Sequence, residues 1–323
     1  MTKLQTFAFV HPMRPDEVNP FAQALPETEL LCLSNGPLPV GLERAQAISL
    51  HWEHPPIDEV LAAARNLRWM HLRGAGIDRV ATPALASSGV IVTNGSGNHS
   101  PNIAEHIMAL MLAFARQLPG LVRAQTEHEW KPPSRKRVFE LGGQTLVIVG
   151  FGAIGQALAT RAAPFGMNVI GVRRSPGGKL PPGVTRVVGM DGLDEALALG
   201  DHIAVCLPLT GQTRHLFNRE RFERFKPGAH FYNVGRGPIV DQDALLQALR
   251  SGKLAGAGLD VTDPEPLAAE SPLWAEPGVV ITAHSAGITP HSLRRWQELL
   301  IGNMQRFARG EPLVNVVDVR LGY

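Results

Sequence analysis

Three polar residues have the types that the reduction of a 2-keto acid requires. Arg236, Glu265 and His284 each lie shortly after an apolar segment that we expect to be a β-strand, where open α/β sheets bind ligands. The guanidinium of Arg236 would bind the substrate carboxylate, and the near-neutral imidazole of His284 would protonate the developing alkoxide. Glu265 would hold and tune that imidazole. We interpret Gly235 and Gly237 as space for a ligand beside Arg236, the alternative for Arg236 being a structural ion pair.

A glycine-rich loop follows the apolar segment 145–149 and precedes a helical segment, 156–164. The loop consists of Gly150, Phe151, Gly152, Ala153, Ile154 and Gly155. In a strand-turn-helix context, Gly150 allows a tight turn, Gly152 lets a pyrophosphate approach, and Gly155 lets the helix pack on the strand. The helix N-terminus would add amide donors for the anion. The loop therefore predicts a dinucleotide site, with a turn that binds nothing as the alternative.

The residues at the end of the next strand indicate which dinucleotide is preferred. An NAD site would have an acidic residue about 20 positions after the loop, to accept from the ribose hydroxyls. This chain has Arg173, Arg174 and Ser175 there, which can bind a 2′-phosphate through charge-assisted hydrogen bonds. We expect NADP(H) to be preferred and NAD(H) to be possible. A solvated basic turn is the alternative.

Two alternating series of apolar and helical segments must position these residues. The first has apolar segments at 7–10, 30–33, 47–50, 69–72 and 90–92, and the second at 145–149, 169–172, 202–206, 230–234, 256–261 and 279–281. A helix capped by Ser100 should connect them, and helices are expected at 241–250 and 290–309, with an extended tail at 310–317. The pattern predicts an α/β protein with two doubly wound parallel sheets.

Composition and charge exclude several classes of function. The 323 residues have a formal net charge of +2, too small to indicate a nucleic-acid or anionic-membrane partner. The apolar runs are too short for a membrane span, so we expect a cytoplasmic protein. Cys32 and Cys206 lie far apart and are expected to be buried thiols. His51 and His54 lack a third donor at metal-ligand spacing, so no metal is expected.

Several stretches resemble the D-isomer-specific 2-hydroxyacid dehydrogenase family over nearly the whole chain. Besides the glycine-rich loop and the three segments around Arg236, Glu265 and His284, they are residues 73–78, 92–95, 102–106, 207–210 and 310–318. The stretch 51–56, with Trp52 and two prolines, is similar to the NADPH-dependent glyoxylate and hydroxypyruvate reductase branch. Arg73 and the stretch 96–99 depart from the family pattern and do not correspond to a known substrate preference of the family.

The resemblance implies roles for further residues. Arg236, Glu265 and His284 would be catalytic, Asp260 would contact the nicotinamide carboxamide, and the amides near Ala75 and Gly76 would hold the substrate carboxylate. Trp52 would either cover the substrate or fill the core of its domain. The remaining cofactor contacts implied are Leu207, Pro208, Thr213, Val234 and Gly287.

The resemblance also implies a domain organisation and an assembly. Residues 1–98 and 290–323 would form a flavodoxin-like substrate domain, interrupted by a Rossmann cofactor domain at 99–289. The helix after Pro101 and the polar excursion 127–137 would pack on a second subunit in a homodimer. The expected ligand is a small 2-keto or 2-hydroxy acid. A dinucleotide-binding corepressor of the same fold is the rival hypothesis.

Overall fold

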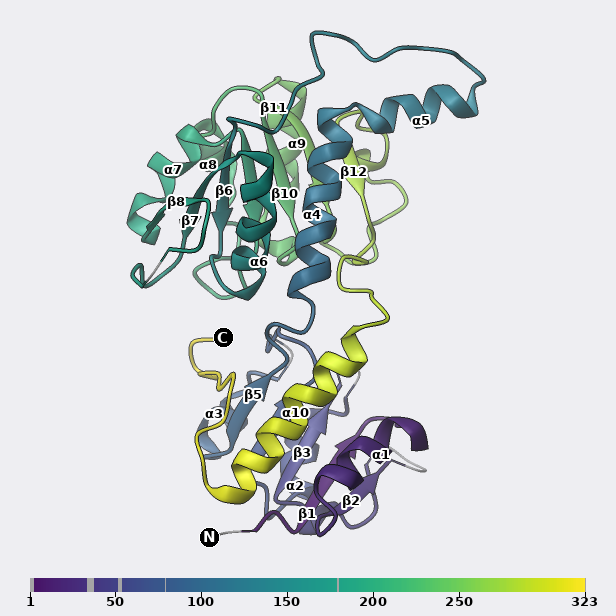
Figure 1. Cartoon of the computed structure of the whole chain (residues 1–323), viewed down its shortest axis with the longest axis vertical. Helices are drawn as coiled ribbons and strands as arrows, with labels where there is room; N and C mark the ends of the chain where they lie inside the picture. The colour runs from purple at the N-terminus through teal and green to yellow at the C-terminus, as the bar shows by residue number, and fades with distance from the viewer. Residues whose placement is uncertain (1–2, 34–37, 52–53, 79, 179, 323) are drawn as a thin grey trace. The chain divides into compact units, whose positions relative to one another are not determined.

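The chain folds into two compact units, each with its own parallel sheet (Figure 1). The computed structural model describes residues 3–33, 38–51, 54–78, 80–178 and 180–322. One unit consists of Met1–Asn98 and Thr289–Tyr323, and the other of His99–Ile288. The predicted fold class, two parallel α/β sheets, is confirmed. The substrate and cofactor roles assigned to the units remain predictions.

The first unit has a five-stranded sheet in the order β2-β1-β3-β4-β5. Its strands are β1 (Thr6–Val10), β2 (Glu29–Cys32), β3 (Ala47–Leu50), β4 (Trp69–Leu72) and β5 (Ile91–Asn94). Its helices are α1 (Pro15–Ala24), η1 (Leu42–Arg44), α2 (Ile57–Ala63), α3 (Pro83–Ser87) and α10 (Ser292–Arg309). Successive strand residues face opposite sides, so Phe7 and Phe9 pack against α1 and α10, while Ala8 and Val10 pack against α2 and α3.

The second unit has a seven-stranded sheet in the order β12-β11-β10-β9-β6-β7-β8. Its strands are β6 (Thr145–Val149), β7 (Asn168–Val172), β8 (Val184–Val188), β9 (His202–Val205), β10 (Ala229–Asn233), β11 (Leu254–Leu259) and β12 (Val279–Ile281). Its helices are α4 (Ser100–Ala115), α5 (Leu118–Thr126), α6 (Ala153–Ala162), η2 (Ala163–Phe165), η3 (Met190–Gly192), α7 (Leu193–Leu199), α8 (Arg219–Glu223), η4 (Gly237–Ile239), α9 (Gln242–Arg250) and η5 (Pro272–Trp274).

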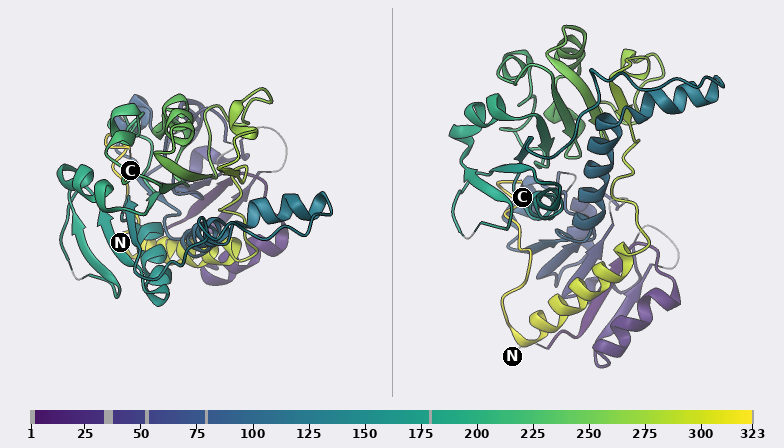
Figure 2. Two further views of the ribbon diagram at one scale, coloured as in Figure 1. Left: turned by 90° about the horizontal axis from the view of Figure 1, so that it is seen from above. Right: turned by 45° about the horizontal axis from the view of Figure 1, so that its top comes forward.

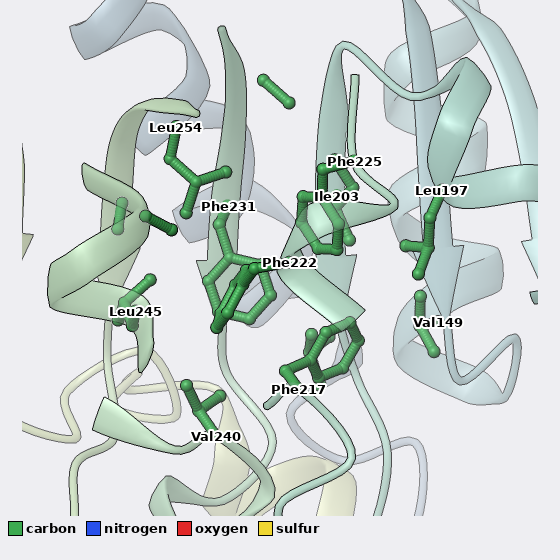
Figure 3. Close-up of a cluster of buried hydrophobic side chains, with 14 of the residues drawn as sticks. Val149, Leu197, Ile203, Phe217, Phe222, Phe225, Phe231, Val240, Leu245 and Leu254 are labelled. Atoms are coloured by element: carbon green, nitrogen blue, oxygen red, sulfur yellow. The ribbon is translucent and has the colours of Figure 1, made fainter. Parts of the chain in front are cut away.

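Helices cover both faces of this larger sheet. One face packs against α4 and α6, and the other against α7, α8 and α9. Figure 3 shows the second interface, where Phe217, Phe222, Phe225 and Phe231 cluster with aliphatic side chains around them. Every strand of the sheet is parallel to its neighbours, so the carboxyl ends of the strands meet at one edge.

Local details differ from the sequence predictions in two places. Ser100 is the first residue of α4 and its hydroxyl caps nothing, because the chain enters the helix at His99. β8 was not predicted, since only one residue of Val184–Val188 is buried and the segment lacks a strong apolar run. The tail 310–317, which we expected to be extended, pairs with β5 through one antiparallel bridge, from Val316 to Thr93.

The helix α5 and the segment 127–137 project from the rest of their unit, as the two views in Figure 2 show. Three large apolar side chains are exposed there, Leu118, Val122 and Trp130. Among the described residues, no single helix is long and apolar enough to cross a membrane. Only α4 and α5 taken together meet the criteria of length and composition, and they bend by 70° at the break between them.

Candidate active site

The glycine-rich loop has a backbone that a dinucleotide could approach. Gly150 has a φ of +103°, and a Cβ there would lie 2.6 Å from the Cys206 carbonyl carbon. A Cβ on Gly155 would lie 2.7 Å from the Gly150 carbonyl oxygen, so this glycine lets α6 pack against the loop. A Cβ on Gly152 would meet nothing within 4 Å, which leaves open space at the N-terminus of α6. The loop therefore fits a bound pyrophosphate.

The first turn of α6 supplies the matching donors. The first hydrogen bond of the helix runs from the amide of Gln156 to the carbonyl of Gly152. The amides of Ala153, Ile154 and Gly155 therefore precede the intrahelical bonds and point out of the helix end. Together with the helix dipole they form an anion-binding end. That this loop binds a cofactor remains a proposal.

The basic turn after β7 is closed on itself. The Arg173 guanidinium donates to the carbonyl of Gly177, and the Arg173 amide donates to the Val188 carbonyl. The Nε of Arg173 is buried and has no hydrogen-bond partner among the described residues. Arg174 and Ser175 are exposed. The turn thus presents cationic groups and a hydroxyl at the end of β7, where a 2′-phosphate would need them.

His284 and Glu265 form the pair that the sequence predicted. The two residues are 19 positions apart, and the Nδ1 of His284 lies 2.9 Å from the Oε2 of Glu265. The other carboxylate oxygen of Glu265 accepts from the Thr262 amide at 3.2 Å, which orients the carboxylate. Both side chains remain partly exposed, at 53% for His284 and 38% for Glu265. The imidazole is thereby oriented and still accessible to a ligand.

The loop that positions His284 is held by Asp260. The carboxylate of this buried residue accepts from the Thr282 hydroxyl at 2.6 Å and from the amides of Ser285 and Ala286 at 2.9 and 3.1 Å. Ala283 and His284 have φ of +45° and +54°, a left-handed conformation that costs a non-glycine residue about 1 to 2 kcal/mol. The bonds to Asp260 offset this strain, so Asp260 positions the candidate acid.

Arg236 lies in a tight turn after β10. The Asn233 side chain accepts from the Gly235 amide and donates to the Arg236 carbonyl, both at 3.0 Å. The half-buried guanidinium of Arg236 donates to the Gly235 carbonyl at 2.9 Å. The interpretation of the two flanking glycines as ligand space is wrong. A Cβ on Gly235 would lie 2.7 Å from the Leu207 carbonyl oxygen, and one on Gly237 would lie 1.8 Å from that of Thr262.

The other residues implied as cofactor contacts lie at the same edge of the sheet. The Thr213 hydroxyl donates to the carbonyl of Pro208 at 2.8 Å and accepts from the Thr210 amide at 2.8 Å, so it closes the loop after β9. Leu207 follows Cys206, whose thiol pKa is raised to about 12 by burial. Val234 is buried directly after β10, and the Gly287 carbonyl is bonded to His99 at 2.9 Å. Their contact with a cofactor remains a prediction.

In the smaller unit, Ala75 and Gly76 lie on an exposed loop after β4. The Asn94 side chain donates to the Ala75 carbonyl at 2.6 Å and fixes the loop. The amides of Ala75 and Gly76 donate no hydrogen bond to another described residue. These donors suit a carboxylate. Trp52, the other predicted substrate contact, lies outside the described residues.

Sequence reasoning missed the residues that support the candidate catalytic loop. Because the Thr282 hydroxyl donates to Asp260, it accepts from the Nε2 of His106 at 2.9 Å, and the Asn102 side chain donates to the Ala286 carbonyl at 2.6 Å. His106 also lies 3.8 Å from Asp260. The signal available was the polar Thr282 directly after an apolar segment, together with two polar residues at helical spacing, Asn102 and His106. Among the described residues, no three potential metal ligands cluster.

Comparison with known proteins decides the family. The family model for the D-isomer specific 2-hydroxyacid dehydrogenase NAD-binding domain matches residues 108–286. A glyoxylate reductase from Korarchaeum cryptofilum is 36% identical over 270 residues, which cover 81% of this chain and 80% of that protein. The chain belongs to the D-isomer specific 2-hydroxyacid dehydrogenase family. The predicted family is confirmed.

Solved structures of the same family extend the likeness to both units. A D-isomer specific 2-hydroxyacid dehydrogenase from Xanthobacter autotrophicus, in complex with NADPH and MES, has a TM-score of 0.85 and 33% identity, covering 99% of each chain. An NADPH-dependent glyoxylate/hydroxypyruvate reductase from Sinorhizobium meliloti, in complex with NADP and sulfate, has a TM-score of 0.82 and 29% identity, covering 99% of this chain and 100% of that one. The chain spans about half the length, 49%, of the D-3-phosphoglycerate dehydrogenases it also matches.

Proposed function

We propose that this protein is a reductase that transfers a hydride from NADPH to C2 of a small 2-keto acid and runs in reverse on the D-2-hydroxy acid. The observation that supports this most directly is the 2.9 Å contact between His284 and Glu265 at the carboxyl edge of the larger sheet. The names of the Korarchaeum and Sinorhizobium relatives favour glyoxylate and hydroxypyruvate as substrates. NADPH, when bound, supplies the hydride.

In this proposal His284 delivers the proton. Because Nδ1 faces the Glu265 carboxylate, Nε2 is the ring nitrogen left to protonate the substrate oxygen. The carboxylate holds the ring in this orientation through the contact at Nδ1. After the transfer, the neutral imidazole still has its proton on Nδ1, where it is hydrogen-bonded to Glu265. Solvent can protonate Nε2 again, since both side chains are partly exposed.

Cationic and amide donors would bind the substrate carboxylate. Arg236 offers the planar guanidinium, and the amides of Ala75 and Gly76, which donate to no other described residue, offer neutral donors. For the cofactor, the loop from Gly150 to Gly155 would hold the pyrophosphate. Arg173 and Arg174 would hold the 2′-phosphate, in keeping with the NADPH bound by the Xanthobacter relative. NADP(H) is therefore proposed as the preferred cofactor.

The test is the loss of NADPH absorbance with glyoxylate, hydroxypyruvate or a branched 2-keto acid. We expect turnover with at least one of them, and we expect His284→Gln to lose most of kcat while NADPH binding stays intact. Glu265→Gln should lower kcat, because the charged acceptor that orients the imidazole at Nδ1 is removed. Near wild-type turnover in His284→Gln would show that the acid is assigned to the wrong residue.

The same assay separates the enzyme from the corepressor hypothesis. A corepressor-like protein would bind the dinucleotide and show no turnover with any 2-keto acid. Binding of NADPH by calorimetry, measured on the same preparation, therefore accompanies the activity assay. Binding without turnover across the substrate panel would overturn the proposed reaction.

A further inference from the structure

Arg73 lies at the carboxyl end of β4, directly before the loop that contains Ala75 and Gly76. Its guanidinium carbon lies 4.7 Å from the centre of the Trp296 ring of α10. Trp296 is 1% exposed, so the cation rests against a rigid aromatic wall. The side chain of Arg73 is half-buried, whereas Gly74, Ala75 and Gly76 are exposed.

The charge of Arg73 is not balanced by a hydrogen-bonded carboxylate. Within the described part of the chain, its guanidinium donates no hydrogen bond and forms no ion pair. Burial lowers the pKa of Arg73, and Glu17 of α1 opposes this through its charge at a distance. Glu17 itself is bonded to Arg14, through the Arg14 amide at 3.0 Å and its guanidinium at 3.1 Å. Five donors on a partly desolvated cation are therefore available to an anion.

Two neighbouring histidines, His11 and His71, are neutral at neutral pH because burial lowers their pKa values. His11 follows β1, and its ring centre lies 6.0 Å from that of His51, which follows β3. Burial, with a smaller contribution from the charge of Arg73, lowers the pKa of His11 to about 4. Burial also lowers the pKa of His71 to about 3. Arg73 therefore has its positive charge next to two neutral imidazoles.

A second arginine shows what a purely structural role looks like. Arg68 precedes β4, and its guanidinium carbon lies 5.3 Å from the centre of the Phe307 ring of the same helix, α10. Both arginines clamp α10 to an end of one strand. Arg68 is exposed at the amino end of β4, and only Arg73 is half-buried beside the candidate carboxylate-binding amides.

We propose that Arg73 binds a second anionic group on the substrate, so that this enzyme prefers dianionic 2-keto acids, with a carboxylate or phosphate at the end remote from the keto acid. This inference rests on the proposed function, because it takes the amides of Ala75 and Gly76 to hold the first carboxylate. The planar guanidinium, held over the Trp296 ring, presents paired donors that match a carboxylate or phosphate.

The test compares matched substrates in the full chain with NADPH. Oxaloacetate and 2-oxobutanoate have the same carbon chain and differ in the second carboxylate, and hydroxypyruvate and its 3-phosphate ester test the phosphate. In each pair that the enzyme turns over, we expect wild type to have the higher kcat/KM with the dianion. In Arg73→Gln the dianion-to-monoanion ratio of kcat/KM should fall roughly tenfold to a hundredfold, the range for a charged hydrogen bond. Arg73→Lys should recover part of it.

Two further measurements keep the inference open to refutation. Arg68→Gln, the matched stacking control, should leave both ratios unchanged, and thermal unfolding should show that each variant folds. Calorimetry should show that succinate binds wild type better than butyrate and that Arg73→Gln abolishes the difference. If 2-keto acids are turned over but neither the ratios nor succinate binding depends on Arg73, this inference is wrong and the reductase stands. If succinate binding depends on Arg73 without any turnover, the anion site stands and the proposed function fails.

Discussion

Acidification should destabilise the larger unit through two stacked histidines at the amino edge of its sheet. His202 is the first residue of β9 and His230 is the second of β10, and their ring centres lie 5.4 Å apart. The ring of Phe139 lies against both, at 5.7 and 5.2 Å between centres. Burial lowers the pKa of His202 to about 3 and that of His230 to about 4. The charge of His230 lowers the pKa of His202 further, and the smaller effect of the Asp201 carboxylate raises both pKa values.

The hydrogen bonds of His202 are made for the neutral ring. Its Nε2 lies 2.6 Å from the Oε1 of Gln144 and must donate to it, so the neutral tautomer has Nδ1 as an acceptor for the Tyr232 hydroxyl at 2.9 Å. Burial raises the pKa of Tyr232, so this hydroxyl keeps its proton. Protonation of Nδ1 would remove the acceptor of a fully buried donor.

The sign and size of the effect follow from these pKa values. Because the folded pKa is below the unfolded value of about 6.5, the unfolded chain takes up protons first, and stability is lost as the pH falls from about 7 toward 4. At pH 5 each histidine should lower the free energy of unfolding by about 2 kcal/mol, or about 4 kcal/mol for the pair, relative to neutral pH. For a unit of this size, that corresponds to a fall in Tm of roughly 8 to 16 °C.

The assay is denaturant or thermal unfolding between pH 8 and pH 5, in wild type and in His230→Phe. Phenylalanine keeps the stacking with Phe114 and Phe139 and removes one titrating ring, so about half of the histidine contribution to the pH dependence should disappear. His215→Asn is the control, since His215 is exposed and asparagine tolerates its φ of +49°. If the free energy of unfolding falls with pH equally steeply in wild type and in His230→Phe, the reasoning is refuted.

Three further predictions concern the cofactor and the assembly. Arg173→Asp should weaken NADPH binding by more than the roughly tenfold to hundredfold expected for one lost charged hydrogen bond, and it should strengthen NADH binding. A wild-type kcat/KM that is higher with NADH than with NADPH would contradict the proposed cofactor. Gly155→Ala should lower Tm, because its Cβ would lie 2.7 Å from the Gly150 carbonyl oxygen. Gly152→Ala should leave Tm unchanged and weaken NADPH binding, because its Cβ would have nothing within 4 Å. Equal losses of Tm in the two variants would count against this prediction. Light scattering should give a dimer mass that Trp130→Glu reduces, since Trp130 is fully exposed on the projecting segment; a monomeric wild type would exclude the homodimer.

The sequence alone determined the fold class and the family, and it supplied the candidate residues for the chemistry. Short apolar segments separated by helical ones predict parallel sheets because each strand must be buried on both faces. The loop from Gly150 to Gly155 was readable because its glycines are required by local backbone geometry within a few residues. Strand ends also indicated where Arg236, Glu265 and His284 would converge.

Only the tertiary structure decided what surrounds these residues. Gly235 is required by a carbonyl of another loop, and Asp260 holds the strained backbone at His284 through bonds to residues 22 to 26 positions away. The stacking of Arg73 on Trp296 joins residues from opposite ends of the chain. Local periodicity contains no information on such contacts, because they depend on which strand ends become neighbours once the sheets have formed. Which groups position a charged side chain, and whether an opposite charge lies beside it, are therefore properties of the folded chain.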